Sequence, residues 1–143
     1  MAGGSRLMVL IDTTVWIDFF GGQSLPHVNA LQQMIEDDED LCICGVILTE
    51  VLQGIRSDAD FRKTKDYLGF LILMPMRPTT FELSASLYRS LRKKGITIRK
   101  PIDCMIASVA IEHDLPLLHN DRDFDQIAKH SKLKLMKVKK PTR

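Results

Sequence analysis

A carboxylate stands where the first apolar run of the sequence ends. Residues 7–11 are typical of a strand that is covered on both faces, and Asp12 follows them directly. In an open α/β sheet, ligands bind beyond the carboxyl ends of the strands, which makes Asp12 a candidate site residue. The alternative is that Asp12 only caps the next helix, for which Thr13 and Thr14 are also candidate caps.

Two more acids follow the apolar pair at 117–118, which we expect to form the last core strand. Asp123 stands three residues before Gln126, a spacing typical of a helix N-cap, and this leaves Asp121 as the freer ligand. His119 stands between the strand and these acids. It could act as a base or bind zinc, but a lone histidine is more often structural.

A fourth acid, Asp103, belongs to the first turn of an expected helix over residues 101–113. That helix is apolar on nearly every side, so we expect it to lie inside the protein. A carboxylate on a buried helix costs free energy unless it is paired, caps a helix or binds a cation. Asp103 is therefore a further candidate.

The elements that position these acids follow from the alternation of short apolar runs with amphipathic segments. The expected strands cover residues 7–11, 41–44, 71–74 and 117–118, with an edge strand near 133–136. The expected helices cover 15–20, 26–35, 46–55, 58–71, 79–94 and 101–113, and one more begins at 123. The helix over 79–94 begins with a capping box formed by Thr79 and Glu82. This alternation predicts an α/β fold, a three-layer α/β/α sandwich with a mostly parallel central sheet.

Length and composition are those of one globular domain. We expect a single domain over residues 7–140, with disordered ends at 1–6 and 141–143. No apolar run approaches the ~20 residues that a membrane-spanning helix needs, and no secretory signal is present, so we expect a cytoplasmic protein. The odd number of cysteines, three, favours reduced thiols over a disulfide framework.

Charge is distributed unevenly along the chain. Residues 1–60 have a net charge of −8, and residues 61–143 have a net charge of +10. A basic patch closes the expected helix over 79–94 and continues beyond it: Arg89, Arg92, Lys93, Arg99 and Lys100. Contact with a polyanion and plain capping of the helix both explain such a patch.

Three other patterns have a structural explanation. The five consecutive acids at 36–40 are typical of a solvated turn. Cys42 and Cys44 share one face of a strand, and no second pair of Cys or His residues at suitable spacing completes a zinc site. Glu50 projects about 130° from the centre of the apolar arc of its helix, so periodicity alone places it in solvent.

Four segments in one order nevertheless resemble a known family. They are residues 9–18 (VLIDTTVWID), 48–55 (LTEVLQGI), 102–107 (IDCMIA) and 120–124 (NDRDF). Together they resemble the PIN-domain nucleases and, more narrowly, the VapC-type toxins of bacterial and archaeal toxin–antitoxin pairs. The resemblance covers nearly the whole chain and implies a PIN-like fold.

The resemblance also implies roles for particular residues. Asp12, Glu50, Asp103 and Asp121 would converge as an acidic, catalytic metal site, with Asp123 as an auxiliary ligand. Thr13, Thr14 and His119 would support these acids without holding the metal. The chain departs from the family twice here, because the family often has a hydroxyl residue at His119 and Asn or Ser at Thr14.

A cluster of carboxylates needs compensating positive charge. Two carboxylates ~5 Å apart repel by roughly 3 kcal/mol at an effective dielectric constant of ~20, so the cluster requires cations or shared protons. Oxygen ligands select hard cations, and we expect Mg²⁺ or Mn²⁺. Such an ion can activate water for attack on a phosphodiester, and the basic patch could then hold an RNA backbone.

The resemblance therefore implies a Mg²⁺-dependent endoribonuclease that acts as a toxin. It implies tRNA or rRNA as target, an antitoxin protein as partner and a homodimer as the working unit. The alternative is a non-catalytic PIN-like RNA-binding or regulatory module, which would typically have lost some of the acids. An aspartyl-phosphate phosphatase is disfavoured, because its motif requires an acid where Thr14 stands.

Overall fold

Four parallel strands form the centre of the computed structural model, which describes residues 7–138. The strands are β1 (Met8–Ile11), β2 (Asp40–Cys44), β3 (Ile72–Met74) and β4 (Leu117–Leu118), in the order β3-β2-β1-β4. Each adjacent pair is parallel. The expected edge strand near 133–136 is reduced to a single bridge between Leu117 and Leu135.

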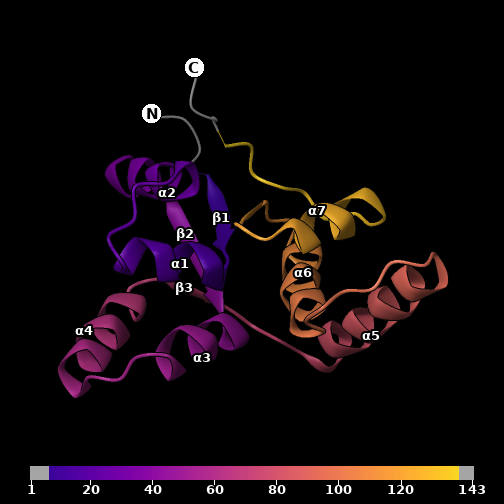
Figure 1. Ribbon diagram of the computed structural model, residues 1–143, viewed down its shortest axis with the longest axis horizontal. Helices are drawn as coiled ribbons and strands as arrows, with labels where there is room; N and C mark the ends of the chain where they lie inside the picture. The colour runs from indigo at the N-terminus through magenta and orange to yellow at the C-terminus, as the bar shows by residue number, and fades with distance from the viewer. Residues whose placement is uncertain (1–6, 139–143) are drawn as a thin grey trace, which may run out of the picture.

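Seven helices connect and flank these strands within residues 7–138. They are α1 (Thr13–Phe20), α2 (Pro26–Glu36), α3 (Gly45–Gln53), α4 (Asp58–Leu68), α5 (Pro78–Lys93), α6 (Ile102–Glu112) and α7 (Arg122–Lys129). In Figure 1, α1, α2 and α4 lie on one side of the strands and α5, α6 and α7 on the other. The predicted α/β fold with a parallel sheet between helical layers is confirmed.

The core lies where the sheet meets α1 and α6. Seven consecutive or near-consecutive positions of α6 are buried, as its apolar sequence predicts. On the other side, the fully buried Trp16 packs against the rings of Phe20 and Tyr67, with centroid distances of 5.8 and 6.0 Å. The cysteines Cys42, Cys44 and Cys104 are buried and unpaired, in agreement with the expected reduced thiols.

Most helix boundaries differ by a few residues from those predicted, and the start of α5 and the end of α4 have a local cause. The N-cap of α5 is Arg77, whose backbone N–H donates to the Thr80 hydroxyl at 3.0 Å, so the predicted Thr79–Glu82 capping box is wrong. Pro78 explains the earlier start, because its fixed φ suits the first helical position. Helix α4 ends at Leu68 and not at residue 71, since the N–H of Gly69 closes the helix on the Lys65 carbonyl.

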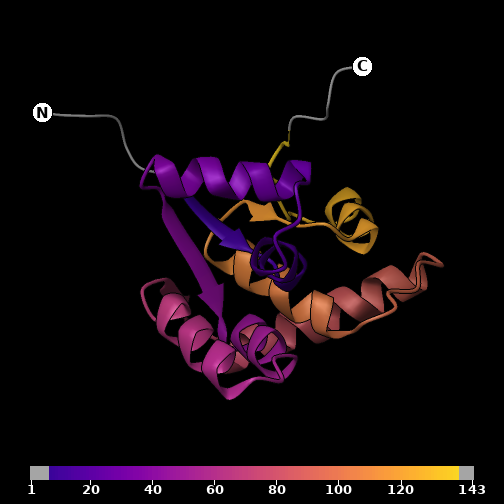
Figure 2. The ribbon, with the colours of Figure 1, turned by 60° about the vertical axis from the view of Figure 1, so that its left-hand side comes forward.

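Parallel strands bring their carboxyl ends to one edge of the sheet. Figure 2 shows β1 and β2 running in the same direction, with α1 and α3 at their tips. The backbone N–H of Asp12 donates to the Leu118 carbonyl at 2.9 Å, which joins the end of β1 to the end of β4. Acids that follow these strands therefore share one rim.

The extent of the domain stays a prediction. The expected domain over 7–140 reaches two residues beyond the described part of the chain, and the ends predicted to be disordered, 1–6 and 141–143, lie outside it. Among residues 7–138, no helix is both long and apolar enough to cross a bilayer.

Burial along β1 predicts how much each side chain contributes to stability. Leu10 is fully buried between β2 and β4, whereas Met8 on the same strand is 37% exposed. We expect Leu10→Ala to lower the free energy of unfolding by about 3 kcal/mol, because it leaves a cavity in the core. Met8→Ala should cost less than about 1 kcal/mol. Urea denaturation measures both, and equal losses would contradict this description of the core.

Candidate active site at the carboxyl edge of the sheet

Asp12 links β1 to α1 and is only 2% exposed. Its Oδ2 accepts hydrogen bonds from the backbone N–H of Thr14 at 3.1 Å and from the Thr14 hydroxyl at 2.6 Å. Asp12 is thus the N-cap of α1, and neither threonine has that role. Burial raises the pKa of the Asp12 carboxyl, and the charge of Glu50 adds to this effect, although the Thr14 hydrogen bonds oppose it.

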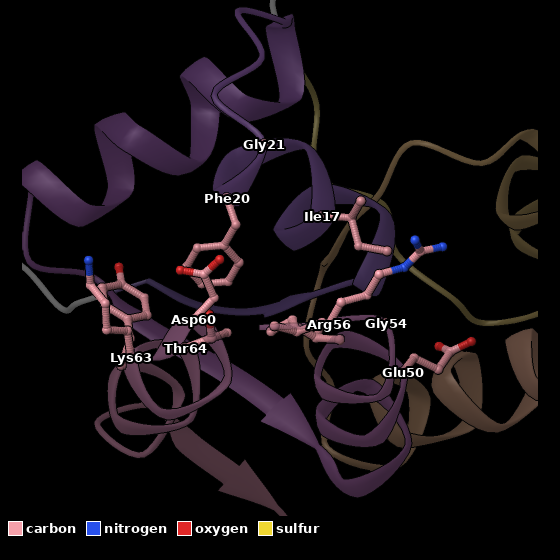
Figure 3. A pocket seen from close by; sticks show the side chains of 12 residues that line it. Ile17, Phe20, Gly21, Glu50, Gly54, Arg56, Asp60, Lys63 and Thr64 are labelled. Carbon is pink, nitrogen blue, oxygen red and sulfur yellow. The ribbon is translucent and has the colours of Figure 1, made fainter. Parts of the chain in front are cut away.

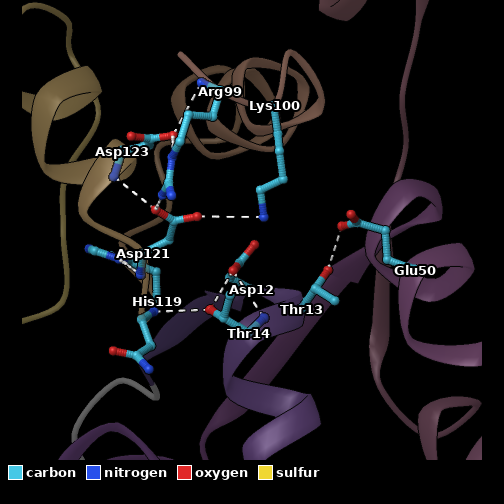
Figure 4. A network of polar contacts seen from close by, with 10 residues as sticks. Asp12, Thr13, Thr14, Glu50, Arg99, Lys100, His119, Asp121 and Asp123 are labelled. Carbon is cyan, nitrogen blue, oxygen red and sulfur yellow. Dashed lines mark hydrogen bonds and ion pairs between the residues drawn. The ribbon is translucent and has the colours of Figure 1, made fainter. Parts of the chain in front are cut away.

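Periodicity predicted that Glu50 points into solvent. The structure shows a different position. Its side chain is half-buried, and its Oε1 accepts a hydrogen bond from the Thr13 hydroxyl at 2.7 Å. Figure 4 shows this contact between α3 and the start of α1. Periodicity measures the apolar arc of α3 alone and contains no information about α1, which packs beside it. The structure therefore brings Glu50 toward the same rim as Asp12.

The helix cap at the start of α7 is not the acid that was predicted. Asp121, and not Asp123, is the N-cap of α7, because its Oδ1 accepts the backbone N–H of Asp123 at 2.9 Å. Asp123 is 7% exposed, and its Oδ2 accepts from the backbone N–H of Arg99 at 3.3 Å and from Arg99 Nε at 3.1 Å. Asp123 thus holds in place a segment that is distant in sequence. The local spacing of residues could not predict this contact.

Asp103 has a buried carboxylate oxygen without a partner among the described residues. It is 2% exposed, and its Oδ2 has no hydrogen-bond partner among residues 7–138. Burial raises its pKa to about 7; the Lys100 charge lowers it in part, whereas the charges of Asp12, Asp121 and Glu50 raise it further. These couplings place Asp103 within electrostatic reach of the other three acids.

These acids fit a hard metal ion. One carboxylate oxygen from each of Asp103, Asp121 and Asp123 lies within 4.8 Å of the other two. A buried carboxylate oxygen without a partner is costly in a protein interior unless a cation or proton compensates it. The donors are all oxygens, which Mg²⁺ and Mn²⁺ prefer and which zinc sites seldom use alone.

Two basic side chains reach into the acidic cluster. Arg99 bridges Asp121 and Asp123, with nitrogen–oxygen distances of 3.0 and 3.1 Å. Lys100 Nζ lies 3.5 Å from Asp121 Oδ2. Burial opposes ionisation of Asp121, but the Asp123 N–H and these two cations outweigh it and lower the pKa of that carboxyl. The remaining members of the predicted basic patch, Arg89, Arg92 and Lys93, are exposed on the last turns of α5.

His119 and Thr14 each accept a backbone N–H from the segment that follows β4. His119 Nδ1 accepts the backbone N–H of Asp121 at 3.0 Å, so this nitrogen carries no proton. Burial lowers the pKa of His119, which favours the neutral ring. The Thr14 hydroxyl accepts the backbone N–H of Asn120 at 3.0 Å while it donates to Asp12. The Thr14 contact with Asn120 ties the ends of β1 and β4 to each other.

Behind these contacts lies a further set of hydrogen bonds, which the sequence analysis did not predict. Asp18 Oδ2 lies 2.6 Å from Nε2 of the buried His27 and accepts from the Asn120 amide at 3.5 Å. Asp18 stands four residues after Thr14, on the same face of α1, so the helical spacing was a usable signal. The partners from α2 and from the loop before α7 could not be read from that spacing.

Comparisons with known proteins show the family of this chain. The PIN-domain family model matches residues 9–130. The chain is 31% identical over 128 residues to VapC ribonuclease Mb1587 from Mycobacterium bovis and to ribonuclease VapC11 from Mycobacterium tuberculosis, covering 88% of this chain and 96% of each relative. The chain belongs to the VapC family of PIN-domain proteins. The resemblance predicted from the four sequence segments is therefore confirmed.

Solved structures show the same fold for VapC-family chains. VapBC2 from Rickettsia felis, bound to a DNA fragment from its promoter, superposes with a TM-score of 0.74 over 93% of this chain and 100% of that chain. VapBC-5 from Mycobacterium tuberculosis gives a TM-score of 0.68 over the same shares. Each is 20% identical to this chain, so these likenesses bear on the fold alone.

A groove in this VapC-family chain begins beside the acidic site. It has a volume of about 660 Å³ and lies between α1, α3 and α4. Ile17, Phe20 and Tyr67 contribute apolar surface, and Arg56 and Lys63 contribute positive charge. Figure 3 shows Glu50 at one end of the groove, so the groove and the acidic site share this side chain.

The raised pKa of Asp103 predicts how the stability of the metal-free chain depends on pH. Between the ordinary pKa of 3.8 and about 7, the folded chain holds a proton that the unfolded chain has released. The free energy of unfolding should therefore decrease as pH rises through this window, by at most about 1.4 kcal/mol per pH unit from this group. Urea denaturation with EDTA at several pH values measures the slope.

Asp103→Asn should flatten that slope, because Asn does not titrate. Asp66→Asn, which changes an exposed acid on α4, should leave it unchanged. A slope that is the same in the parent chain and in Asp103→Asn would show that Asp103 has an ordinary pKa in the folded chain.

Proposed function

We propose that the chain is a Mg²⁺-dependent endoribonuclease, the toxin of a toxin–antitoxin pair, that hydrolyses phosphodiester bonds of tRNA or rRNA. The observation that carries the proposal is the buried Asp103 carboxylate, which has an oxygen without a hydrogen-bond partner among residues 7–138, lies beside Asp121 and Asp123, and is acted on by the charges of Asp12 and Glu50. An interior that served stability alone would have apolar residues at these positions. The relatives' names, VapC ribonucleases, support the same activity.

Asp12, Glu50, Asp103 and Asp121 would hold the metal, with Asp123 beside them. Bound Mg²⁺ supplies an activated water and stabilises charge on the phosphodiester. The threonines fix the acids in place: Thr14 orients Asp12, and Thr13 orients Glu50. This preorganisation limits the rearrangement that binding requires. Asp123 acts mainly through Arg99, whose backbone and side chain it anchors.

RNA would approach over the basic second half of the chain. Arg99 and Lys100 stand at the acidic rim, and Arg89, Arg92 and Lys93 extend positive charge along α5. Such a stripe suits the phosphates of a folded RNA that is larger than the site itself. Folded RNAs of this kind, tRNA and rRNA, act in the cytoplasm, and we place the protein there.

A cognate antitoxin is the proposed protein partner. The solved structures with this fold include toxin–antitoxin complexes from Klebsiella pneumoniae and Salmonella typhimurium, the latter bound to DNA. In this chain the groove beside Glu50 offers an apolar wall, and Ile17 there is 55% exposed. An antitoxin segment lying in this groove would end beside the acidic site and block it.

We propose a homodimer as the working unit. The edge strand β3 and Phe70, which stands just ahead of that strand, expose large apolar side chains, with Phe70 at 89% and Leu73 at 59%. Apolar groups at a sheet edge favour contact with another chain.

Removal of single acids tests the nuclease activity. We expect Asp103→Asn and Asp12→Asn to lower the rate of cleavage of a tRNA or rRNA mixture by about 100-fold or more, because each removes a charge that the metal requires. Asp66→Asn should cleave at the parent rate. Cleavage by the parent should require added Mg²⁺ and stop with EDTA. Undiminished cleavage by both folded variants would contradict the proposed site, whereas absence of cleavage by the parent would favour a non-catalytic RNA-binding module.

A substitution in the groove tests the partner. Ile17→Ser should weaken binding of the antitoxin encoded next to this chain by about tenfold, because a half-exposed apolar side chain loses its contact. Phe61→Ser is the matched control: Phe61 is 38% exposed and does not line the groove. Isothermal titration calorimetry measures both affinities. Equal losses in the two variants, or none in Ile17→Ser, would place the antitoxin on another surface.

A further inference from the structure

The Lys100 ammonium reaches the acidic site from the loop before α6. Its Nζ lies 3.5 Å from Asp121 Oδ2, and Figure 4 shows it pointing into the space between Asp121 and Asp12. The charges of Asp103, Asp121 and Asp12 all act on it and raise the pKa of Lys100, against the opposing effect of burial. Arg99 lies closer to Asp121, at 3.0 Å, but the Lys100 ammonium is the cation on which the charges of Asp103 and Asp12 act together with that of Asp121.

The two oxygens of Asp121 have different partners. Oδ1 accepts from the backbone N–H of Asp123 and from Arg99, and both of these contacts lie on the α7 side. Oδ2 contacts Lys100. Asp121 can therefore keep its capping role and its Arg99 bridge while Oδ2 exchanges one cation for another.

The backbone on either side of Lys100 is fixed, but its side chain is not. The Lys100 carbonyl accepts the N–H of Asp103 at 2.9 Å, and the Arg99 N–H is held by Asp123. Pro101 follows and restricts the conformation of Lys100. The side chain is 49% exposed, and its flexible stem lets the ammonium leave Asp121 while the backbone stays in place.

We propose that Lys100 is a tethered counter-ion of the acidic site, which it neutralises in the metal-free chain and which it leaves when a divalent cation binds. The inference rests on the proposed metal site and adds that the metal ion binds in exchange for the Lys100 ammonium. A cation of charge +2 and an ammonium a few ångströms apart repel each other strongly, so the two compete for Asp121. Lys100 then stabilises the fold without metal and weakens the affinity for metal.

Metal affinity tests the exchange. Isothermal titration calorimetry with Mn²⁺ on the full chain should show about tenfold tighter binding by Lys100→Met than by the parent, because the competing charge is gone. Lys100→Arg keeps the charge and should stay close to the parent. Lys93→Met, which removes an exposed lysine of α5, should not differ from it. Without metal, Lys100→Met should also melt at a lower temperature than Lys93→Met.

A second measurement uses the parent chain alone. Acylation of lysines by an amine reagent, read by peptide mass spectrometry, should increase severalfold at Lys100 when Mn²⁺ saturates the protein. Lys93 should react equally with and without the ion. A Lys100 reactivity that Mn²⁺ leaves unchanged would overturn the exchange, even if the Lys100→Met chain failed to fold.

The outcomes separate this inference from the proposed function. Equal, measurable Mn²⁺ affinity in the parent and in Lys100→Met would overturn the exchange and leave the metal site intact. Weaker binding by Lys100→Met would also overturn it, because Lys100 would then assist the metal. Absence of Mn²⁺ binding in the parent and in every variant would overturn the metal site and the exchange together.

Discussion

Repulsion among carboxylates held at one edge of a parallel sheet is the constraint on which the rest of this structure depends. Asp12 and Asp103 are each 2% exposed, and their charges raise each other's cost of ionisation. Parallel strands bring Asp12 and Asp121 to one edge, since the ends of β1 and β4 lie side by side and are joined through Asp12, and the first turn of α6 adds Asp103. The surrounding residues either share the negative charge or balance it: Thr13 and Thr14 donate hydrogen bonds, and Arg99 and Lys100 supply cations.

Much of the scaffold could be predicted from sequence because its signals are local. Short apolar runs such as residues 7–11 indicated strands, and the nearly all-apolar sequence of α6 indicated a buried helix. The structure has both. Asp12 and Asp121 could be found by the same reasoning, because each follows such a run. Glu50 could not, since its position depends on how α3 packs against α1, and only the family resemblance indicated its role.

At the site, the differences between prediction and structure arise from contacts between segments that are distant in sequence. The spacing of Asp123 and Gln126 predicted a cap, but Arg99, 24 residues earlier in the chain, engages Asp123 and leaves the capping to Asp121. The basic patch was predicted as one RNA-binding unit, yet its two halves differ: Arg99 and Lys100 contact acids, whereas the residues of α5 face solvent. Local patterns identify which residues carry charge, and the tertiary fold decides which charges meet.

The account requires that one cation compensates acids from several segments. Anomalous diffraction from crystals grown with saturating Mn²⁺ tests this requirement most directly, because it locates the ion without reference to activity. We expect a peak bounded by Asp12, Asp103 and Asp121, within bonding distance of Asp103 Oδ2. A Mn²⁺ peak only at the acidic turn over residues 36–40, with Asp12 and Asp103 free of metal, would contradict the account.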